Sequence, residues 1–227
     1  MEKIAAVVLA AGQGSRMKSS CPKQYLEINE RPMIYYSLKV LEESPVDDVI
    51  LVVNSGEEQK RKKEIVDRFG FRKVKKVIAG GTERYFSVCY GLRALKETDY
   101  VLIHDGARPM LTNGLVCKTI EMVKRYKACA AAVLSKDTVK LVKEDGTITQ
   151  QLERNKVRLI QTPQAFVYSE IRDAYEKLLN QNTITVTDDT EVYEKMLGKP
   201  VILFEGSYQN IKVTTPEDLE VARIFLQ

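Results

Sequence analysis

The sequence predicts an α/β fold, in which a mostly parallel sheet carries helices on both of its faces. Three observations support this prediction. Short apolar runs alternate with amphipathic helical segments over residues 3–135. The first run, KIAAVVLAA at residues 3–11, is apolar after its lysine, as expected for a strand that is buried on both faces. Residues 136–158 break this alternation with a hairpin pattern, after which it resumes.

The segments of the first part follow one another in a regular order. Predicted strands are the apolar runs, and predicted helices carry apolar residues at helical spacing. Strands are expected at residues 3–11, 47–54, 73–81, 99–109 and 128–135, and helices at residues 32–44, 57–70, 84–97 and 113–127. Units of this kind connect parallel strands through right-handed crossovers. The expected sheet is therefore Rossmann-like, with ligands bound beyond the carboxyl ends of its strands.

Residues 136–158 form a separate element, in which polar and apolar residues alternate around Glu144-Asp145-Gly146. This pattern is typical of a β-hairpin. Because the hairpin is polar and has little core of its own, we expect it to project as an arm. Such an arm would lean on another surface, for example that of a second subunit.

The α/β pattern resumes after the arm. Helices are expected at residues 169–181, 187–198 and 214–226, and a strand at residues 201–206. Thr187 or Asp188 is expected to cap the second of these helices and Gly198 to end it. Thr215 followed by Pro216 is a strong start for the last helix. We predict one domain over residues 1–227, with the arm as its only subregion.

Composition excludes several classes of protein. The chain has 227 residues and a net charge of +4, and its basic clusters at 59–64 and 72–76 lack the interleaved aromatic residues of nucleic-acid binders. Neither an apolar run of about 18 residues nor a signal-peptide pattern occurs, so we expect no membrane contact and a cytoplasmic location. Four cysteines without a CxxC pair and the single histidine, His104, do not predict a zinc site.

The loop after the first strand suits an anion. Gly12 and Gly14 are followed by Arg16 and Lys23. Small residues let backbone amides converge on a phosphate, and an arginine can grip two of its oxygens. The third glycine of the dinucleotide fingerprint is missing, as is the Gly-Lys-Ser/Thr of a P-loop. A phosphate-binding loop of another kind is therefore predicted.

HDGARP at residues 104–109 is a second candidate. Asp105 follows a buried strand, where a carboxylate is costly without a partner. Arg108 could pair with it in a purely structural role. Alternatively, Asp105 could bind a magnesium ion together with substrate phosphates.

Two further positions have both a functional and a structural interpretation. Gly80 and Gly81, at the end of the third strand, would let a base or a ribose approach the backbone, but a tight turn would explain them equally well. Lys212 stands between Ile211 and Val213 in a short apolar strand context. Its side chain therefore points away from the core, either to solvent or to a ligand.

Five stretches carry a family resemblance across nearly the whole chain: LAAGQGSRM with PKQYL, HDGARP, QTPQAF, TDD and NIKVTTPEDL. In this order they resemble the cytidylyltransferases that act on 2-C-methyl-D-erythritol 4-phosphate in the non-mevalonate isoprenoid pathway. Ribitol-5-phosphate cytidylyltransferases of teichoic acid synthesis share much of the pattern. LAAG, HDGARP and TDD look more like the erythritol enzymes.

The resemblance implies a role for each matching residue. The triphosphate of CTP would be held by Ala10, Ala11, Gly12, Gly14, Arg16 and Lys23, and the cytosine and ribose by Gly80, Gly81 and Ser87. The acceptor and its phosphate would be received by Thr138, Arg154, Thr162 and Lys212, and Asp105 would bind Mg²⁺ and lie near the acceptor as part of its binding site. Catalysis would rest on Arg16, Lys23, Arg154 and Lys212. The family often has Asp after the glycine pair, where this chain has Thr82.

The resemblance also implies a homodimer joined through the 136–158 arm, so that Arg154 would serve the neighbouring site. The acceptor phosphate would attack the α-phosphate of CTP and release pyrophosphate. Because a phosphate monoester is largely dianionic at neutral pH, no general base is required. Two rivals stay open: a nucleotide-binding regulatory module without turnover, and an oxidoreductase. Pyrophosphate release excludes the first, and nicotinamide fluorescence tests the second.

Overall fold

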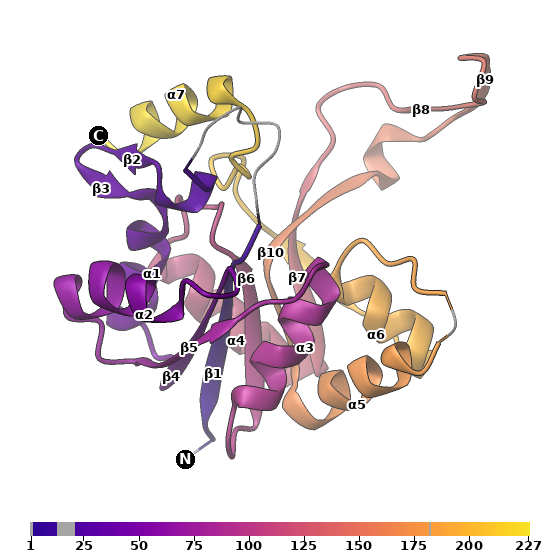
Figure 1. Cartoon of the computed structure of the whole chain (residues 1–227). Coiled ribbons are helices and arrows are strands. Elements are labelled where there is room, and N and C mark those ends of the chain that lie inside the picture. The colour runs from indigo at the N-terminus through magenta and orange to yellow at the C-terminus, as the bar shows by residue number, and fades with distance from the viewer. Residues whose placement is uncertain (1, 13–20, 182) are drawn as a thin grey trace.

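A seven-stranded sheet forms the centre of the computed structural model, which describes residues 2–12, 21–181 and 183–227. The strand order is β11-β7-β10-β6-β1-β4-β5 (Figure 1). The strands are β1 (Ile4–Ala10), β4 (Asp48–Val53), β5 (Val74–Ala79), β6 (Tyr100–Asp105), β7 (Ala128–Leu134), β10 (Arg158–Val167) and β11 (Ile202–Glu205). Only β10 runs antiparallel to its neighbours, β6 and β7. The predicted α/β class with a mostly parallel sheet is confirmed.

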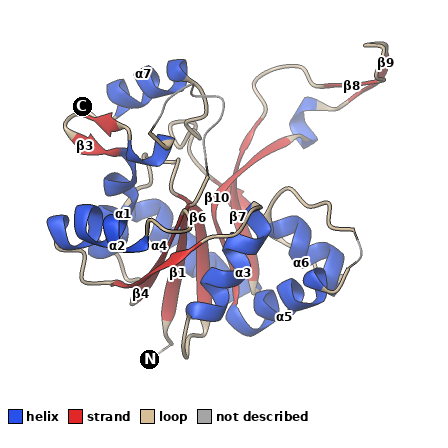
Figure 2. Cartoon of the chain, in the orientation of Figure 1, coloured by secondary structure: helices blue, strands red, loops and turns tan. Residues whose placement is uncertain are grey.

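Helices cover both faces of this sheet, as predicted (Figure 2). On one face lie α1 (Met33–Glu43), α2 (Glu58–Arg61), its π-helical continuation η3 (Lys62–Asp67) and α4 (Asn113–Tyr126), and on the other lie α3 (Arg84–Ala94), α5 (Tyr168–Leu179) and α6 (Asp189–Leu197). The last helix, α7 (Pro216–Phe225), packs against the small hairpin of β2 (Glu27–Ile28) and β3 (Arg31–Pro32). Among the described residues, no helix has the length and apolar character needed to span a bilayer.

The first strand explains why the fold is predictable. Every residue of β1 is buried, and its side chains alternate between the two cores. Ala6 and Val8 pack with α1 and α4, whereas Ala5 and Val7 pack with α3 and α5. A strand between two helical layers must be apolar on both faces, which is the pattern that the sequence shows.

The arm projects from the carboxyl end of β7 (Figure 1). It contains the antiparallel strands β8 (Lys140–Val142) and β9 (Ile148–Gln151), followed by a 3₁₀ turn, η4 (Arg154–Lys156). The hairpin prediction is confirmed, although its paired segments are short. All residues of β8 and β9 are exposed, so the arm has no core of its own.

The helix termini also follow the sequence. Asp188 caps α6 by accepting a hydrogen bond from the Glu191 amide at 2.9 Å, and Gly198 ends this helix with a φ of +63°. Thr215 forms a capping box at the start of α7, with Pro216 in the first position.

Four local expectations were wrong or incomplete. The strand β10 was missed because Pro163 and polar glutamines interrupt its pattern; its pairing with β7 shifts register between Ile160 and Gln164. The hairpin of β2 and β3 was also missed, because two-residue strands give no periodicity. A continuous helix does form at residues 58–69, within the expected range 57–70, but its middle is π-helical and its Arg61 is buried rather than solvated. The segment around Lys212 forms no strand.

Candidate active site

A cavity of about 1200 Å³ opens at the carboxyl ends of four adjacent strands, β6, β1, β4 and β5. Each strand contributes the residues that follow it to the lining: Ala11 and Gly12 after β1, Asn54 and Ser55 after β4, Gly80 and Gly81 after β5, and Asp105 and Ala107 at the end of β6. Parallel strands end at the same edge of a sheet, so these distant segments meet there.

The cavity brings together many of the predicted site residues. Those in its lining are Ala11, Gly12, Lys23, Gly80, Gly81, Ser87, Asp105 and Lys212. Ala10 and Thr162 are buried and lie outside the lining, and Thr138 and Arg154 are exposed on the arm. Gly14 and Arg16 lie outside the described residues.

Gly80, Gly81 and Ser87 form one wall of the cavity. The Ser87 hydroxyl accepts a hydrogen bond from the Gly81 amide at 3.1 Å, which ties the wall to α3. A Cβ at Gly80 would lie 2.5 Å from the Ala11 Cβ and 2.7 Å from the Ser87 hydroxyl, and one at Gly81 would overlap Phe86. The glycines are therefore required by close packing, and they leave backbone exposed to a flat ligand.

Gly80→Ala is expected to weaken about tenfold the binding of CTP, the nucleotide that the resemblance implies, because the added methyl group must push Ala11 or Ser87 out of place. Calorimetric titration with CTP measures the change. Gly114→Ala is the matched control, since a Cβ at Gly114 meets no atom within 4 Å. Unchanged CTP affinity in the Gly80 variant would show that this wall does not contact the nucleotide.

Lys23 lies in η2 (Lys23–Tyr25) and lines the same cavity. Only 8% of the residue is exposed, and its ammonium group donates a hydrogen bond to the Val213 carbonyl at 2.8 Å. The loop after β1 is therefore connected directly to the segment that carries Lys212.

Asp105 lies between two cations. Its Oδ2 is 2.7 Å from the Lys212 ammonium group, and its Oδ1 is 3.3 Å from the Nε of Arg84. Burial alone would raise the pKa of Asp105, but Arg84 and Lys212 outweigh it and hold this pKa well below its usual range. The carboxylate is thus ionised at any physiological pH.

The structural alternative for Asp105, an ion pair with Arg108, is wrong, because Arg84 and Lys212 contact this carboxylate. Arg108 instead donates hydrogen bonds to the carbonyls of Asn210, at 2.7 Å, and Ile160. Arg108 thus connects Asn210, two residues before Lys212, to Ile160 of β10. Sequence reasoning missed Arg84, whose position at the start of α3, three residues after Gly81, was the available signal.

Lys212 follows Asn210, the residue held by Arg108, and lines the cavity. The Val213 amide donates a hydrogen bond to the Ala107 carbonyl at 2.9 Å, and Val213 is fully buried. These contacts leave Lys212 on the opposite side, with 40% of its side chain exposed and its ammonium group on Asp105. The predicted direction of the side chain is confirmed, although no strand forms here.

His104 lies behind Asp105 and is fully buried. Its Nδ1 is 3.1 Å from the Thr162 hydroxyl, and its Nε2 is 3.2 Å from the Arg108 carbonyl. The Thr162 hydroxyl also accepts a hydrogen bond from the Asp105 amide. This pattern fits a neutral ring with its proton on Nε2. Burial lowers the pKa of His104 to about 4. Thr162 and His104 therefore support Asp105 from behind.

Stability is expected to fall with acid because of His104. In the unfolded chain its pKa returns to about 6.5, so the unfolded state takes up a proton before the folded state does. The free energy of unfolding should be about 2 kcal/mol lower at pH 5 than at pH 7. Urea titrations at both pH values measure it. Since this is the only histidine in the chain, His104→Gln should remove most of the difference; an unchanged difference would contradict the assignment.

Comparison with known proteins decides the family. The family model for IspD, described as 2-C-methyl-D-erythritol 4-phosphate cytidylyltransferase, matches residues 4–227. The chain belongs to this family. A family member from Lachnoclostridium phytofermentans is 49% identical over 227 residues, covering 100% of this chain and 97% of the relative. One from Clostridium kluyveri is 45% identical over 218 residues, covering 96% and 94%.

Solved structures agree. The 4-diphosphocytidyl-2C-methyl-D-erythritol synthase of Anaerococcus prevotii is 34% identical, with a TM-score of 0.87 over 100% of this chain and 99% of that one. The 2-C-methyl-D-erythritol 4-phosphate cytidylyltransferase of Thermus thermophilus has a TM-score of 0.79 at 27% identity, covering 97% of each chain. The resemblance drawn from the motifs is confirmed.

A magnesium site at Asp105 is not favoured by its surroundings in this family member. The described residues contain no group of three or more His, Cys, Asp or Glu side chains that could hold a metal. Asp105 is a single carboxylate, and each of its oxygens already contacts a cation. A protein-held metal ion would have to displace Lys212 or Arg84, so the donor set does not fit one.

Proposed function

We propose that the chain joins CTP to 2-C-methyl-D-erythritol 4-phosphate and releases pyrophosphate, giving 4-CDP-2-C-methyl-D-erythritol. One observation carries this proposal. Lys23, Asp105 with Lys212, and the glycine wall line a single cavity at the carboxyl ends of the parallel strands. These residues correspond to the three parts that the reaction needs: a triphosphate clamp, an acceptor site and a nucleoside wall.

The chemistry of this site is charge compensation. The attacking phosphate oxygen and the triphosphate are both anions, so the barrier includes their mutual repulsion. Lys23 would offset the charge that develops on the α-phosphate and the leaving pyrophosphate. Lys212, held on Asp105 at 2.7 Å, would place a positive charge where the acceptor phosphate enters.

No described side chain of the cavity is needed as a proton acceptor. His104 has both ring nitrogens within hydrogen-bond distance of protein atoms and is fully buried, so it supports Asp105 rather than contacting a substrate. The acceptor phosphate is itself the nucleophile and is largely dianionic at neutral pH. Arg16, which lies outside the described residues, is proposed to share this role with Lys23.

Magnesium belongs to the proposal only as a partner of the nucleotide. Mg²⁺ is commonly bound through substrate phosphate oxygens and water, with few protein ligands. This suits a cavity whose carboxylate is already paired. The ion would supply further neutralisation of the triphosphate.

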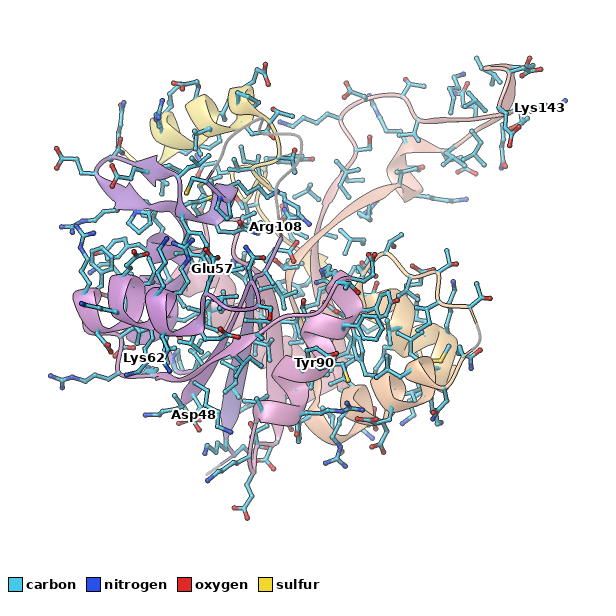
Figure 3. All side chains as sticks on the ribbon, viewed as in Figure 1. Asp48, Glu57, Lys62, Tyr90, Arg108 and Lys143 are labelled. Atoms are coloured by element: carbon cyan, nitrogen blue, oxygen red, sulfur yellow. The ribbon has the colours of Figure 1, made fainter. Side chains whose placement is uncertain are left out.

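A homodimer joined through the arm is also part of the proposal. The arm extends far from the cavity, with Lys143 at its outer end and Glu57 and Tyr90 beside the cavity (Figure 3). It exposes Leu141, Val142 and Ile148, whose apolar side chains would be covered by a second copy. Thr138 and Arg154 lie on the same arm, outside the lining of their own cavity, which supports a role in the partner's site.

A Val142→Asp, Ile148→Asp double variant is expected to shift the protein from dimer to monomer and to lower turnover, because it places charges on the arm's apolar face. Light scattering after size exclusion measures the mass. Ile224→Asp on α7 is the matched control, since Ile224 is even more exposed, at 65%, but lies away from the arm. A wild-type monomer, or a double variant that stays dimeric, would contradict this arrangement.

Pyrophosphate release tests the reaction itself. The assay supplies CTP and magnesium with 2-C-methyl-D-erythritol 4-phosphate, or with ribitol 5-phosphate, in parallel. We expect release with the first acceptor, in agreement with the names of the relatives. Faster release with ribitol 5-phosphate would support the alternative acceptor, and binding of CTP without release would support a regulatory module. A cytoplasmic location, where CTP is available, stays a prediction.

A further inference from the structure

The motif Thr187-Asp188-Asp189 contributes to the family resemblance but has no part in the cavity lining. Its first two residues hold the start of α6. Thr187 binds the Glu191 carboxylate through its amide and its hydroxyl, and Asp188 caps α6 and accepts a hydrogen bond from the Gln164 side chain at 3.1 Å. Asp189 is different, because its carboxylate is fully buried and forms an ion pair with Arg84 of α3.

Asp189 grips the guanidinium group of Arg84 with both oxygens. The two terminal nitrogens of Arg84 donate to them at 2.8 and 2.7 Å. The Tyr175 hydroxyl donates to one of the same oxygens at 2.5 Å, and the Asp189 amide donates to Gln164 at 3.0 Å. The position of this carboxylate is therefore fixed by three elements, α5, α6 and β10.

The third nitrogen of Arg84 extends this arrangement to the cavity. A guanidinium group is planar, so a carboxylate that holds its two terminal nitrogens also fixes the direction of Nε. Here Nε points to Asp105, whose other oxygen holds Lys212. Four alternating charges thus run from the buried start of α6 to the cavity wall: Asp189, Arg84, Asp105 and Lys212.

We propose that Asp189 is a positioning residue for the acceptor phosphate, acting through Arg84 and Asp105 on Lys212. Asp189 itself lies outside the cavity lining. Without its charge, Arg84 would be free to turn its terminal nitrogens to Asp105 and compete with Lys212, or to turn into the cavity. Either movement of Arg84 changes the position of the positive charges that would bind the acceptor phosphate. This inference rests on the proposed function, in which Lys212 receives that phosphate.

The first test is the Asp189→Asn variant, with the KM of each substrate measured separately. We expect the KM for the acceptor to rise about tenfold while the KM for CTP stays within about twofold, since a small misplacement affects the group that Lys212 positions. Glu176→Gln is the matched control. Glu176 holds Arg93, on the same helix α3, through two hydrogen bonds at 2.8 and 2.6 Å, far along the helix from the cavity. Both KM values should be unchanged in this control.

A double-mutant cycle tests whether the effect passes through Lys212. If it does, Asp189→Asn combined with Lys212→Ala should lower kcat/KM for the acceptor no further than Lys212→Ala alone. A purely structural role for Asp189 predicts a lower melting temperature with losses that multiply. Multiplying losses, or equal changes in both KM values, would overturn the proposal.

Asn at a fully buried position can prevent folding, so Arg84→Lys provides a second variant. Lysine keeps the positive charge but lacks the planar fork, so it cannot hold both Asp189 oxygens and direct a third nitrogen at Asp105. The same selective rise in the acceptor KM is expected, and an unchanged acceptor KM in this folded variant would overturn the proposal. If the wild-type protein releases pyrophosphate and the variants show no selective effect, only this inference fails. If the wild type releases none, the proposed function fails with it.

Discussion

Lys23→Ala is expected to slow turnover about 10²–10³-fold, which is the usual cost of removing one charged group that stabilises a transition state. Lys23 is largely buried and belongs to the cavity lining, where water competes weakly for a phosphate. In this structure it donates to the Val213 carbonyl, so it is held in place before the substrate arrives. Single-turnover rates at saturating CTP and acceptor measure the effect on the chemical step.

Loss of the Val213 contact could itself disturb the cavity, so this prediction needs a control. Lys76 also donates to a backbone carbonyl, that of Ala94, at 2.8 Å, but it lies outside the cavity lining. Lys76→Ala should therefore leave turnover unchanged. Lys23→Met removes the charge and keeps most of the stem, and it should be nearly as slow as Lys23→Ala. A near-normal rate in both Lys23 variants would remove Lys23 from the catalytic group.

The parallel topology of the sheet made it predictable that residues far apart in the sequence meet in one site. Buried strands such as β1 can be recognised in the sequence as continuous apolar runs, because both of their faces are covered. Once the strands are known to be parallel, their carboxyl ends share an edge, and the residues that follow them must meet. Gly80, Asp105 and the loop after β1 were brought together by this argument alone, and the cavity lining confirms it.

The partners within the site were less predictable. Asp105 has Arg108 three positions along the chain, yet its partners are Lys212 and Arg84. Arg84 is held there because the packing of α6 places Asp189 beside the start of α3. Arg108 points to the carbonyls of Asn210 and Ile160 instead. Which cation reaches a carboxylate depends on how separate elements pack, and a local pattern does not contain that information. The antiparallel β10 was missed because Pro163 and polar glutamines interrupt its apolar pattern, so only its pairing with β6 and β7 identifies it as a strand.

The position of Lys212 depends on the same tertiary contacts. Two buried anchors hold the chain on either side of it, the Asn210 carbonyl on Arg108 and the Val213 amide on the Ala107 carbonyl. The ammonium group can therefore reach Asp105 without a regular strand. The Val213 carbonyl, in turn, receives Lys23. One short segment, residues 210–213, thus carries Lys212 and also holds the ammonium group of Lys23.

Lys212→Ala is expected to lower kcat/KM for the acceptor about 10²-fold, while the affinity for CTP changes by less than about twofold. The glycine wall at the end of β5 and Lys23 are separate side chains, and the backbone carbonyl that holds Lys23 is unaffected by the substitution. Asp105 also keeps Arg84 as a partner, so no buried carboxylate is left unpaired. Calorimetric titration with CTP and initial rates over a range of acceptor concentrations separate the two effects. Equal losses for CTP and for the acceptor would show that Lys212 serves the whole site, and the separation of the two substrates between Lys23 and Lys212 would then be wrong.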